Sequence, residues 1–384
     1  MRLICTLSDQ EQAYALSALL QEKGIVNELD VTTHTDWGSP DYGTIACRIW
    51  VREEDQVAEA MQVMEAFQQN PTSIPLQKAP TTAETVQPPT EEEAAAEARQ
   101  PIGPMTLYLV TICAILLTIS SMTSPTITIK SVPEGVPTTP LLAAPIEKDL
   151  MFDYPKAFEI IDQIIETYGQ TSLETPDTLP EAGKELLNQF HLTPYWKGIY
   201  DNITAWYRNV PSTNNLNAPM FEKIRQGEIW RLFSPALMHG NIFHLFFNMA
   251  WLVILGRQME QRLGKLRYLL FILIGAAIPN IAQYLMSGSE FLGFSGVVCA
   301  MVVFVWTRQR HTAWEGYLLD KSTMIFISAF VILMCLIQLG SFFLEAYTNA
   351  DMPIGIANTA HLTGAIIGWI LGRMSFFSWR NRWA

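Results

Sequence analysis

The sequence has few of the residues from which disulfide frameworks and metal sites are built. Its five cysteines, Cys5, Cys47, Cys113, Cys299 and Cys335, show no C-x-x-C spacing, and none lies between residues 121 and 231. Small disulfide-rich folds and structural zinc sites use closely spaced cysteines. We therefore expect neither a disulfide framework nor a metal site.

Basic residues are also scarce. The chain has 25 Lys and Arg against 37 Asp and Glu, a formal net charge of −12. The acidic excess lies in residues 1–231, with 15 basic and 31 acidic residues, whereas residues 232–384 carry 10 and 6. Because nucleic-acid binding needs clustered Lys and Arg, we expect no nucleic-acid partner. The N-terminus also lacks the basic and then apolar pattern of a signal peptide.

The second half of the chain is rich in long apolar runs. A helix needs about 20 apolar residues to cross the hydrocarbon core of a bilayer. We predict an all-α polytopic membrane protein with six transmembrane helices, in a membrane domain over residues 101–384. The predicted spans are Pro101–Ser120, Leu237–Gly256, Tyr268–Met286, Phe294–Trp306, Ser322–Phe343 and Ala357–Leu371.

Short loops between the spans differ sharply in their basic residues. Loops 287–293 and 344–356 have no Lys or Arg. The loops on the other side and the C-terminal tail hold Arg257, Arg262, Lys265, Arg267, Arg308, Arg310, Lys321, Arg373, Arg380 and Arg382. Since cytosolic loops are enriched in Lys and Arg, both termini are predicted to be cytosolic and segment 121–231 to be a large outer loop.

The polar parts of the chain divide into three segments. Residues 1–70 predict a small α+β, ferredoxin-like domain, with strands at 3–7, 25–31 and 45–51 and helices at 11–23 and 53–67. Residues 71–100 are rich in Pro and Glu, a composition that predicts a disordered linker. Residues 121–231 are too charged to enter lipid as a whole.

Two stretches of the outer segment are amphipathic. Ala157–Tyr168 carries an apolar stripe at helical spacing, and Tyr195–Tyr207 is dense in Tyr, Trp and Ile. Aromatic residues of that density are typical of the lipid headgroup layer. The same pattern also fits the core of a small helical insert, and the sequence leaves both interpretations open.

The tetrapeptide Gly293-Phe294-Ser295-Gly296 opens the fourth predicted span. Taken alone it would be a turn, but its span is 13 residues, about 20 Å of helix against a hydrocarbon core of about 30 Å. The residues before Ser295 would then lie at membrane depth, where irregular backbone is tolerated only around a protein-lined or watery cavity. We expect Ser295 at the floor of an outward-facing pocket.

Two other spans carry histidines at comparable depth. His361 shares a helical face with Gly364, Gly368 and Gly372, and the fourth span has Gly296 and Ala300; such small faces let two helices approach closely. The second span supplies His244 and Asn248 one turn apart. Each polar group alone would be explained by a hydrogen bond between helices, but their occurrence on three spans at one depth favours a catalytic site.

These residue types suit nucleophilic catalysis. A serine needs a base, and the tetrahedral oxyanion needs hydrogen-bond donors. We predict Ser295 as the nucleophile, His361 as the base, and His244, Asn248 and the Ser295 backbone N–H as oxyanion donors. With no Asp or Glu at suitable depth in a span, the pair is predicted to be a dyad.

The sequence resembles the rhomboid family of intramembrane serine proteases, in particular its bacterial members with a small cytosolic domain. The motifs are Trp230-Arg231, His239-x4-His244-x3-Asn248, Gly293-Phe294-Ser295-Gly296 and Ala360-His361-x2-Gly364. The resemblance implies a multi-pass protein of the bacterial inner membrane, without cofactors. It also implies a site opening to the periplasmic side, where transmembrane-helix proteins in the lipid bilayer are cleaved within or beside their spans.

Two features depart from the family pattern: the long outer segment, and Cys299 where bacterial members commonly have Tyr. Three other functions fit the sequence less well. A pseudoprotease, which binds membrane proteins without cutting them, typically lacks the Ser or His. A transporter would show charged groups or repeated broken helices along its pathway, and a soluble serine hydrolase needs a strand before Ser295.

Overall fold

The computed structural model describes residues 2–33, 44–51, 53–69, 101–126, 135–209, 216–312, 315–348 and 357–379. The chain forms two compact units, Met1–Glu93 and Ala94–Ala384. The predicted linker 71–100 falls outside the described residues.

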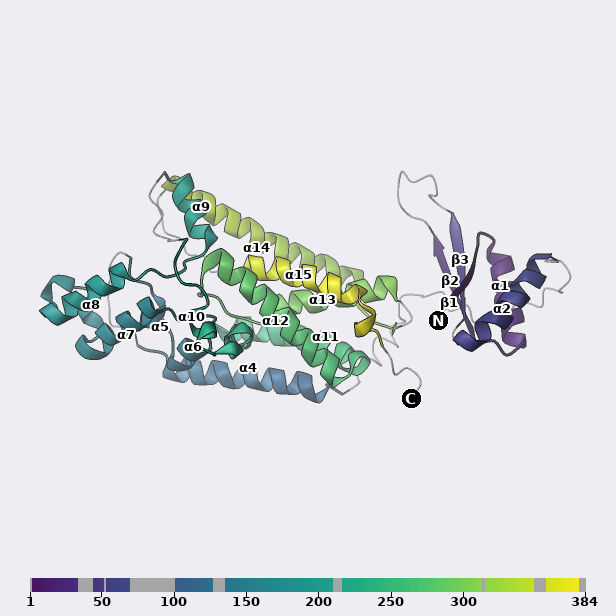
Figure 1. Ribbon diagram of the computed structural model, residues 1–384, viewed down its shortest axis with the longest axis horizontal. Coiled ribbons are helices and arrows are strands. Elements are labelled where there is room, and N and C mark those ends of the chain that lie inside the picture. The colour runs from purple at the N-terminus through teal and green to yellow at the C-terminus, as the bar shows by residue number, and fades with distance from the viewer. Residues whose placement is uncertain are drawn as a thin grey trace. The chain divides into compact units, whose positions relative to one another are not determined.

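The first unit is a small three-stranded sheet with two helices on one face (Figure 1). Its elements are β1 (Arg2–Leu7), α1 (Gln10–Glu22), β2 (Asn27–Thr33), β3 (Ile45–Val51) and α2 (Val57–Gln69). β3 lies between β1 and β2 and is antiparallel to both. Leu16, Leu20 and Ile49 are fully buried between the sheet and the helices. The predicted strands and helices are confirmed to within a few residues.

The second unit contains a group of long helices. They are α4 (Pro104–Thr123), α11 (Ile242–Leu263), α12 (Lys265–Ser287), α13 (Ser295–His311), α14 (Lys321–Thr348) and α15 (Asn358–Arg373). Among the described residues, α4, α11, α12 and α14 are long and apolar enough to cross a membrane. α13 and α15 have 17 and 16 residues, less than the usual length of about 20. The six-span arrangement therefore stays a prediction.

Two helices run further than their predicted spans. α13 continues past Trp306 to His311, and α11 past Gly256 to Leu263. Each extension includes a basic residue that was predicted to lie in a loop and that the structure buries within the helix, Arg308 in α13 and Arg262 in α11. Arg308 pairs with the buried Glu315, and Arg262 donates to the carbonyl oxygen of Glu315 at 2.8 Å. Because these charges are satisfied, they do not end the helices.

The outer segment is folded into short helices. They are α5 (Thr139–Leu142), α6 (Pro145–Leu150), α7 (Lys156–Tyr168), α8 (Glu181–Leu192), α9 (Ile199–Tyr207) and α10 (Glu222–Arg225). The stripe predicted at 157–168 is α7, whose Ile161 and Ile164 are fully buried in one cluster with Leu173 and Phe190. The long segment between α4 and α11 thus has a core of its own.

A buried aspartate fixes this segment to the long helices. Asp153, 1% exposed, accepts hydrogen bonds from the backbone N–H groups of Glu222 and Lys223 and from the Tyr284 hydroxyl of α12, at 3.0, 3.0 and 2.9 Å. Phe152 stacks on Tyr284 with ring centroids 4.7 Å apart. A fully bonded buried carboxylate is costly to move, so the outer segment is rigidly attached.

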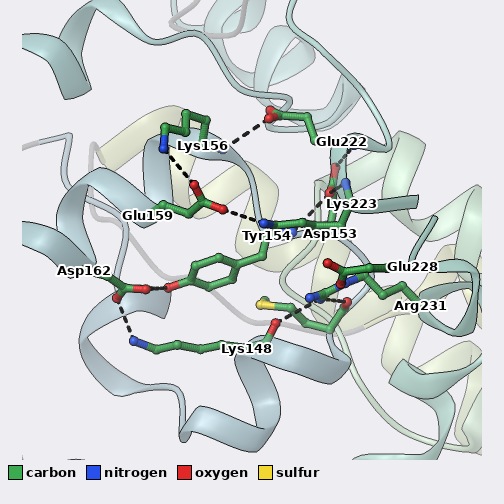
Figure 2. Close-up of polar contacts among 11 residues, drawn as sticks. Lys148, Asp153, Tyr154, Lys156, Glu159, Asp162, Glu222, Lys223, Glu228 and Arg231 are labelled. Carbon is green, nitrogen blue, oxygen red and sulfur yellow. Dashed lines mark hydrogen bonds and ion pairs between the residues drawn. The ribbon is translucent and has the colours of Figure 1, made fainter. Parts of the chain in front are cut away.

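Around this anchor lies a network of paired charges, shown in Figure 2. Lys148 binds Asp162 at 2.7 Å, and Lys223 binds Glu159 at 2.5 Å. Burial alone would raise the pKa of Glu159, but the hydrogen bonds and charges of Lys223 and Lys156 outweigh it, so its pKa is lowered. A carboxyl group with a lowered pKa stabilises the fold above its unfolded pKa of about 4.3, and this contribution is lost as the pH falls through the folded pKa.

The lowered pKa of Glu159 predicts that the effect of Lys223→Met on stability depends on pH. At pH 7 the variant should lose up to about 1 kcal/mol, since the Glu159 side chain is partly solvent-exposed and its pair is screened. The loss should shrink as the pH falls below the unfolded pKa of about 4.3 and through the lower folded pKa of Glu159. Thermal unfolding of the two purified proteins at a series of pH values between 7 and 3 measures this loss of stability. Lys184→Met, which removes an exposed pair with Glu181 on α8, is the matched control; a loss for Lys223→Met that does not vary with pH would contradict the assignment.

Candidate active site

Ser295 and His361 meet between α13 and α15. Ser295 is the first residue of α13, and His361 lies in the first turn of α15. The distance between Ser295 Oγ and His361 Nε2 is 2.7 Å, within hydrogen-bonding range. His361 is 9% exposed. The structure thus brings together the two residues predicted as nucleophile and base, although 66 residues separate them in sequence.

Small residues create this contact. A Cβ atom added at Gly364 would collide with the carbonyl oxygen of Gly296, and one added at Gly368 with that of Ala300. α13 and α15 therefore touch backbone to backbone, as the predicted small faces require. The approach of the two helices sets the distance between Ser295 and His361.

Gly368→Ala should push these helices apart. The new methyl group meets rigid backbone, and overpacking of this kind typically costs about 1–3 kcal/mol. We expect a lower unfolding temperature and a large loss of activity, because the contact between Ser295 and His361 depends on the same helix pair. Gly340→Ala on α14, where an added Cβ has nothing within 4 Å, should be neutral or slightly stabilising. Equal behaviour of the two variants would show that the close approach is unimportant.

The second ring nitrogen of His361 differs from the first in having no partner among the described residues. This atom, Nδ1, is buried and has no hydrogen-bond partner in the described part of the chain. A third, orienting carboxylate is therefore not seen there, and packing must hold the ring. Cys299, one turn after Ser295, is also buried. It behaves as a small apolar residue in the core.

His244 lies against the loop before Ser295, and Asn248 follows it one turn later on α11. Gly293 has φ +120°, and a Cβ on it would lie 2.6 Å from His244 Cε1, so the imidazole rests against the Gly293 backbone. Asn248 is 5% exposed and donates from Nδ2 to the His244 carbonyl oxygen at 3.0 Å, which leaves its second N–H available. Only glycine suits this combination of positive φ and close approach.

The remaining predicted site residues have structural partners. His239 is 2% exposed and packs on His244, with ring centroids 5.1 Å apart. Arg231 donates to the carbonyl oxygens of Lys148 and Met151, and Trp230 donates to that of Asp149. Both bind backbone carbonyl groups in the last turn of α6 or directly after it, and none of these bonds reaches the Ser295–His361 pair.

Sequence reasoning missed two polar residues of α12. Gln283 accepts a hydrogen bond from Ala360 N–H at 3.0 Å, beside His361, and donates to Ser287 Oγ at 2.8 Å. Asn280 donates to the Leu232 carbonyl oxygen at 2.9 Å. Both are buried polar residues inside an apolar span, three residues apart, which is the signal that singled out His244 and Asn248. Gln283 caps the N-terminus of α15 and fixes the start of the helix that carries His361.

The outer segment holds the loop that leads to Ser295. Phe291 packs on Phe152 with ring centroids 5.8 Å apart, and Leu292 joins a cluster with Met151 and Phe158. Gly293 N–H donates to the Pro235 carbonyl oxygen at 3.0 Å. The residues before the nucleophile are therefore fixed from outside as well as from within the helix group.

A cavity of about 590 Å³ lies on the outer segment, among the residues of Figure 2. Lys148, Lys223 and Arg231 line it, and each already pairs with an acidic side chain. It is distinct from the contact between Ser295 and His361. Among the described residues there is also no cluster of three or more His, Cys, Asp or Glu that could hold a metal ion.

Comparison with known proteins points to one family. The family model described as the rhomboid domain matches residues 226–377. The chain is 34% identical over 154 residues to proteins named rhomboid protease GlpG from Yersinia pestis and Yersinia pseudotuberculosis, covering 40% of this chain and 50% of theirs. It is 28% identical over 162 residues to the protein of that name from Salmonella paratyphi A, covering 42% and 54%. The chain thus spans about half the length of these curated relatives.

Proposed function

We propose that this chain, whose residues 226–377 belong to the rhomboid family, is an intramembrane serine endopeptidase that cleaves membrane proteins within or near their transmembrane helices. The observation that carries the proposal is the 2.7 Å contact between Ser295 Oγ and His361 Nε2 at the start of a buried helix. The relatives are named proteases, which supports the same chemistry for this domain.

In the proposed reaction, Ser295 Oγ attacks the carbonyl carbon of the scissile peptide bond while His361 Nε2 takes the hydroxyl proton. The carbonyl oxygen gains the negative charge of the tetrahedral intermediate. The Ser295 backbone N–H, left without an intrahelical partner at the start of α13, would donate to it together with His244 and the second N–H of Asn248. His361 then protonates the leaving amine, and water hydrolyses the acyl-enzyme with His361 as the base again.

We further propose the location of this chemistry. The helices α4, α11, α12 and α14 would cross a bacterial inner membrane, with α13 and α15 completing six spans and both termini in the cytosol. The basic residues at the ends of α11, α13 and α15 support this orientation. The site would then open on the periplasmic side and receive single transmembrane helices from the bilayer.

The test is to reconstitute the purified full chain in lipid vesicles with a panel of single-span membrane proteins. Mass analysis of the products should locate a cut within or beside the span of at least one of them. A substrate that copurifies with the chain but remains intact, across the whole panel, would instead support binding without cleavage.

A further inference from the structure

Helix α9 presents one apolar face that the rest of the described chain covers only in part. Ile199, Ile203 and Trp206 stand at positions i, i+4 and i+7, which places them on one side of the helix. They are 43%, 42% and 78% exposed. The side chains of Thr204 and Ala205 on the other side are buried. A tryptophan exposed to this degree, in line with two isoleucines, needs an explanation.

The buried side of α9 rests on the ends of two long apolar helices. The Tyr207 hydroxyl donates to the Tyr347 hydroxyl at 2.8 Å, and the Tyr207 ring packs on Phe342 with centroids 5.5 Å apart. Both partners lie near the C-terminal end of α14. Gly198, with φ +95°, lets the start of α9 approach the backbone of Met286 and Ser287 at the C-terminal end of α12. α9 therefore lies at the level where both helices end, and Figure 1 shows it crossing the end of α14.

The surface next to α9 is one that lipid must cover. α14 has a mean hydropathy of 2.4 in its most apolar window, and 6% of that window is buried. Phe330, Leu336 and Leu339 are each at least half exposed along it. α9 lies beside the C-terminal end of this helix. In a membrane, that end lies at the boundary between hydrocarbon and headgroups, where Trp and Tyr are enriched.

We infer that α9 is an interfacial helix, whose stripe of Ile199, Ile203 and Trp206 inserts into the headgroup layer of the outer leaflet. The size of the stripe argues against a protein partner. Ile199 and Ile203 are already more than half buried, so the three side chains together offer far less than the area of about 800 Å² that each side of a stable protein interface buries. A stripe of this width is enough for shallow insertion of an amphipathic helix. This inference rests on membrane insertion and not on protease activity.

The consequence for the fold is a second attachment of the outer segment. Asp153 holds it to α12 through Tyr284, and α9 would hold it to the membrane surface beside α14. Only the part of the outer segment around α9 would then lie on the bilayer, whereas α8 lies far from the ends of α12 and α14 (Figure 1). It would assign residues 199–207 of the aromatic stretch to the headgroup layer, whereas Tyr195 and Trp196 of the same stretch pack in hydrophobic clusters.

A lipid-soluble carbene probe tests the inference on the unmodified full chain. The protein is reconstituted in vesicles of phosphatidylethanolamine and phosphatidylglycerol, labelled by light with glutathione in the water phase, and analysed peptide by peptide. Residues 199–207 should be labelled severalfold more than residues 185–192 of α8. The α8 peptide is the matched control because Leu192 is 74% exposed on a helix that Figure 1 shows far from the ends of α12 and α14.

Peptides of α14 supply the level expected for full lipid contact. The variant Ile203→Asp, which replaces an exposed side chain and removes no core contact, should lower the labelling of α9 and leave that of α14 unchanged. Labelling of α9 no higher than that of α8 would overturn the inference, whether water or a second copy of the chain covers the stripe. A crosslink between the α9 helices of two copies, found with the same low labelling, would identify the second copy as the occupant.

Discussion

Replacing Ser295 or His361 with alanine is expected to abolish cleavage, and replacing both should be no worse than replacing one. The two side chains are 2.7 Å apart and act on one proton. Once the nucleophile is lost the base has nothing to activate, and residues that act as a unit are non-additive in this way. Each single variant should lose activity on the order of 10⁴-fold or more.

Asn248→Ala separates this effect from general damage to the site. It should be milder, on the order of 10²- to 10³-fold, because one oxyanion donor is lost and others remain. The measurement is the initial rate of cleavage of one single-span substrate by each purified variant in detergent, with circular dichroism as the folding control. Multiplicative losses in the double variant would mean that Ser295 and His361 act independently, against the dyad.

The second large effect is expected on stability, at the opposite end of α13 from Ser295. Glu315 is 0% exposed and forms a bidentate pair with Arg308, including a bond of 2.7 Å from Nε to Oε2. It also accepts from the backbone N–H of Trp379 at 2.9 Å, while Arg308 donates to the Gly372 carbonyl oxygen at 3.1 Å. One carboxylate therefore joins the end of α13 to the end of α15.

Glu315→Gln should destabilise the membrane unit by about 3 kcal/mol, because it leaves a buried guanidinium without its counter-charge. The measurement is thermal unfolding in detergent. Asp320→Asn makes the same change of charge at an exposed position between α13 and α14 and should change little. If the two variants unfold at the same temperature, the pair does not stabilise the fold.

Features that depend on local pattern were predictable from the sequence. Periods of two and 3.6 residues located the strands and helices of the first unit and α7. The polar residues at one depth of three apolar spans located Ser295, His361 and His244. The glycines at Gly364 and Gly368 predicted that two helices touch, since no other residue permits that contact.

Features that depend on distant partners were not predictable in the same way. The predicted end of α13 came too early because Arg308, taken alone, indicates a loop. Its charge is neutralised by Glu315, and sequence pattern does not reveal that pair. The attachment of the outer segment depends on Asp153 meeting Tyr284, 131 residues away, and neither residue stands out in its own stretch. Gln283 was predictable. It is a polar residue within an apolar span, which is the same signal that singled out His244 and Asn248.

The most direct test of the account is whether His361 activates Ser295. A fluorophosphonate probe reacts with a serine hydroxyl only when it is activated as a nucleophile. Peptide mass spectrometry of the labelled full chain should find the adduct on Ser295 in the wild type, much less of it in His361→Ala, and none at this position in Ser295→Ala. Labelling of Ser295 that is equal in the wild type and in His361→Ala, or absent from both while a substrate is cleaved, would contradict the mechanism.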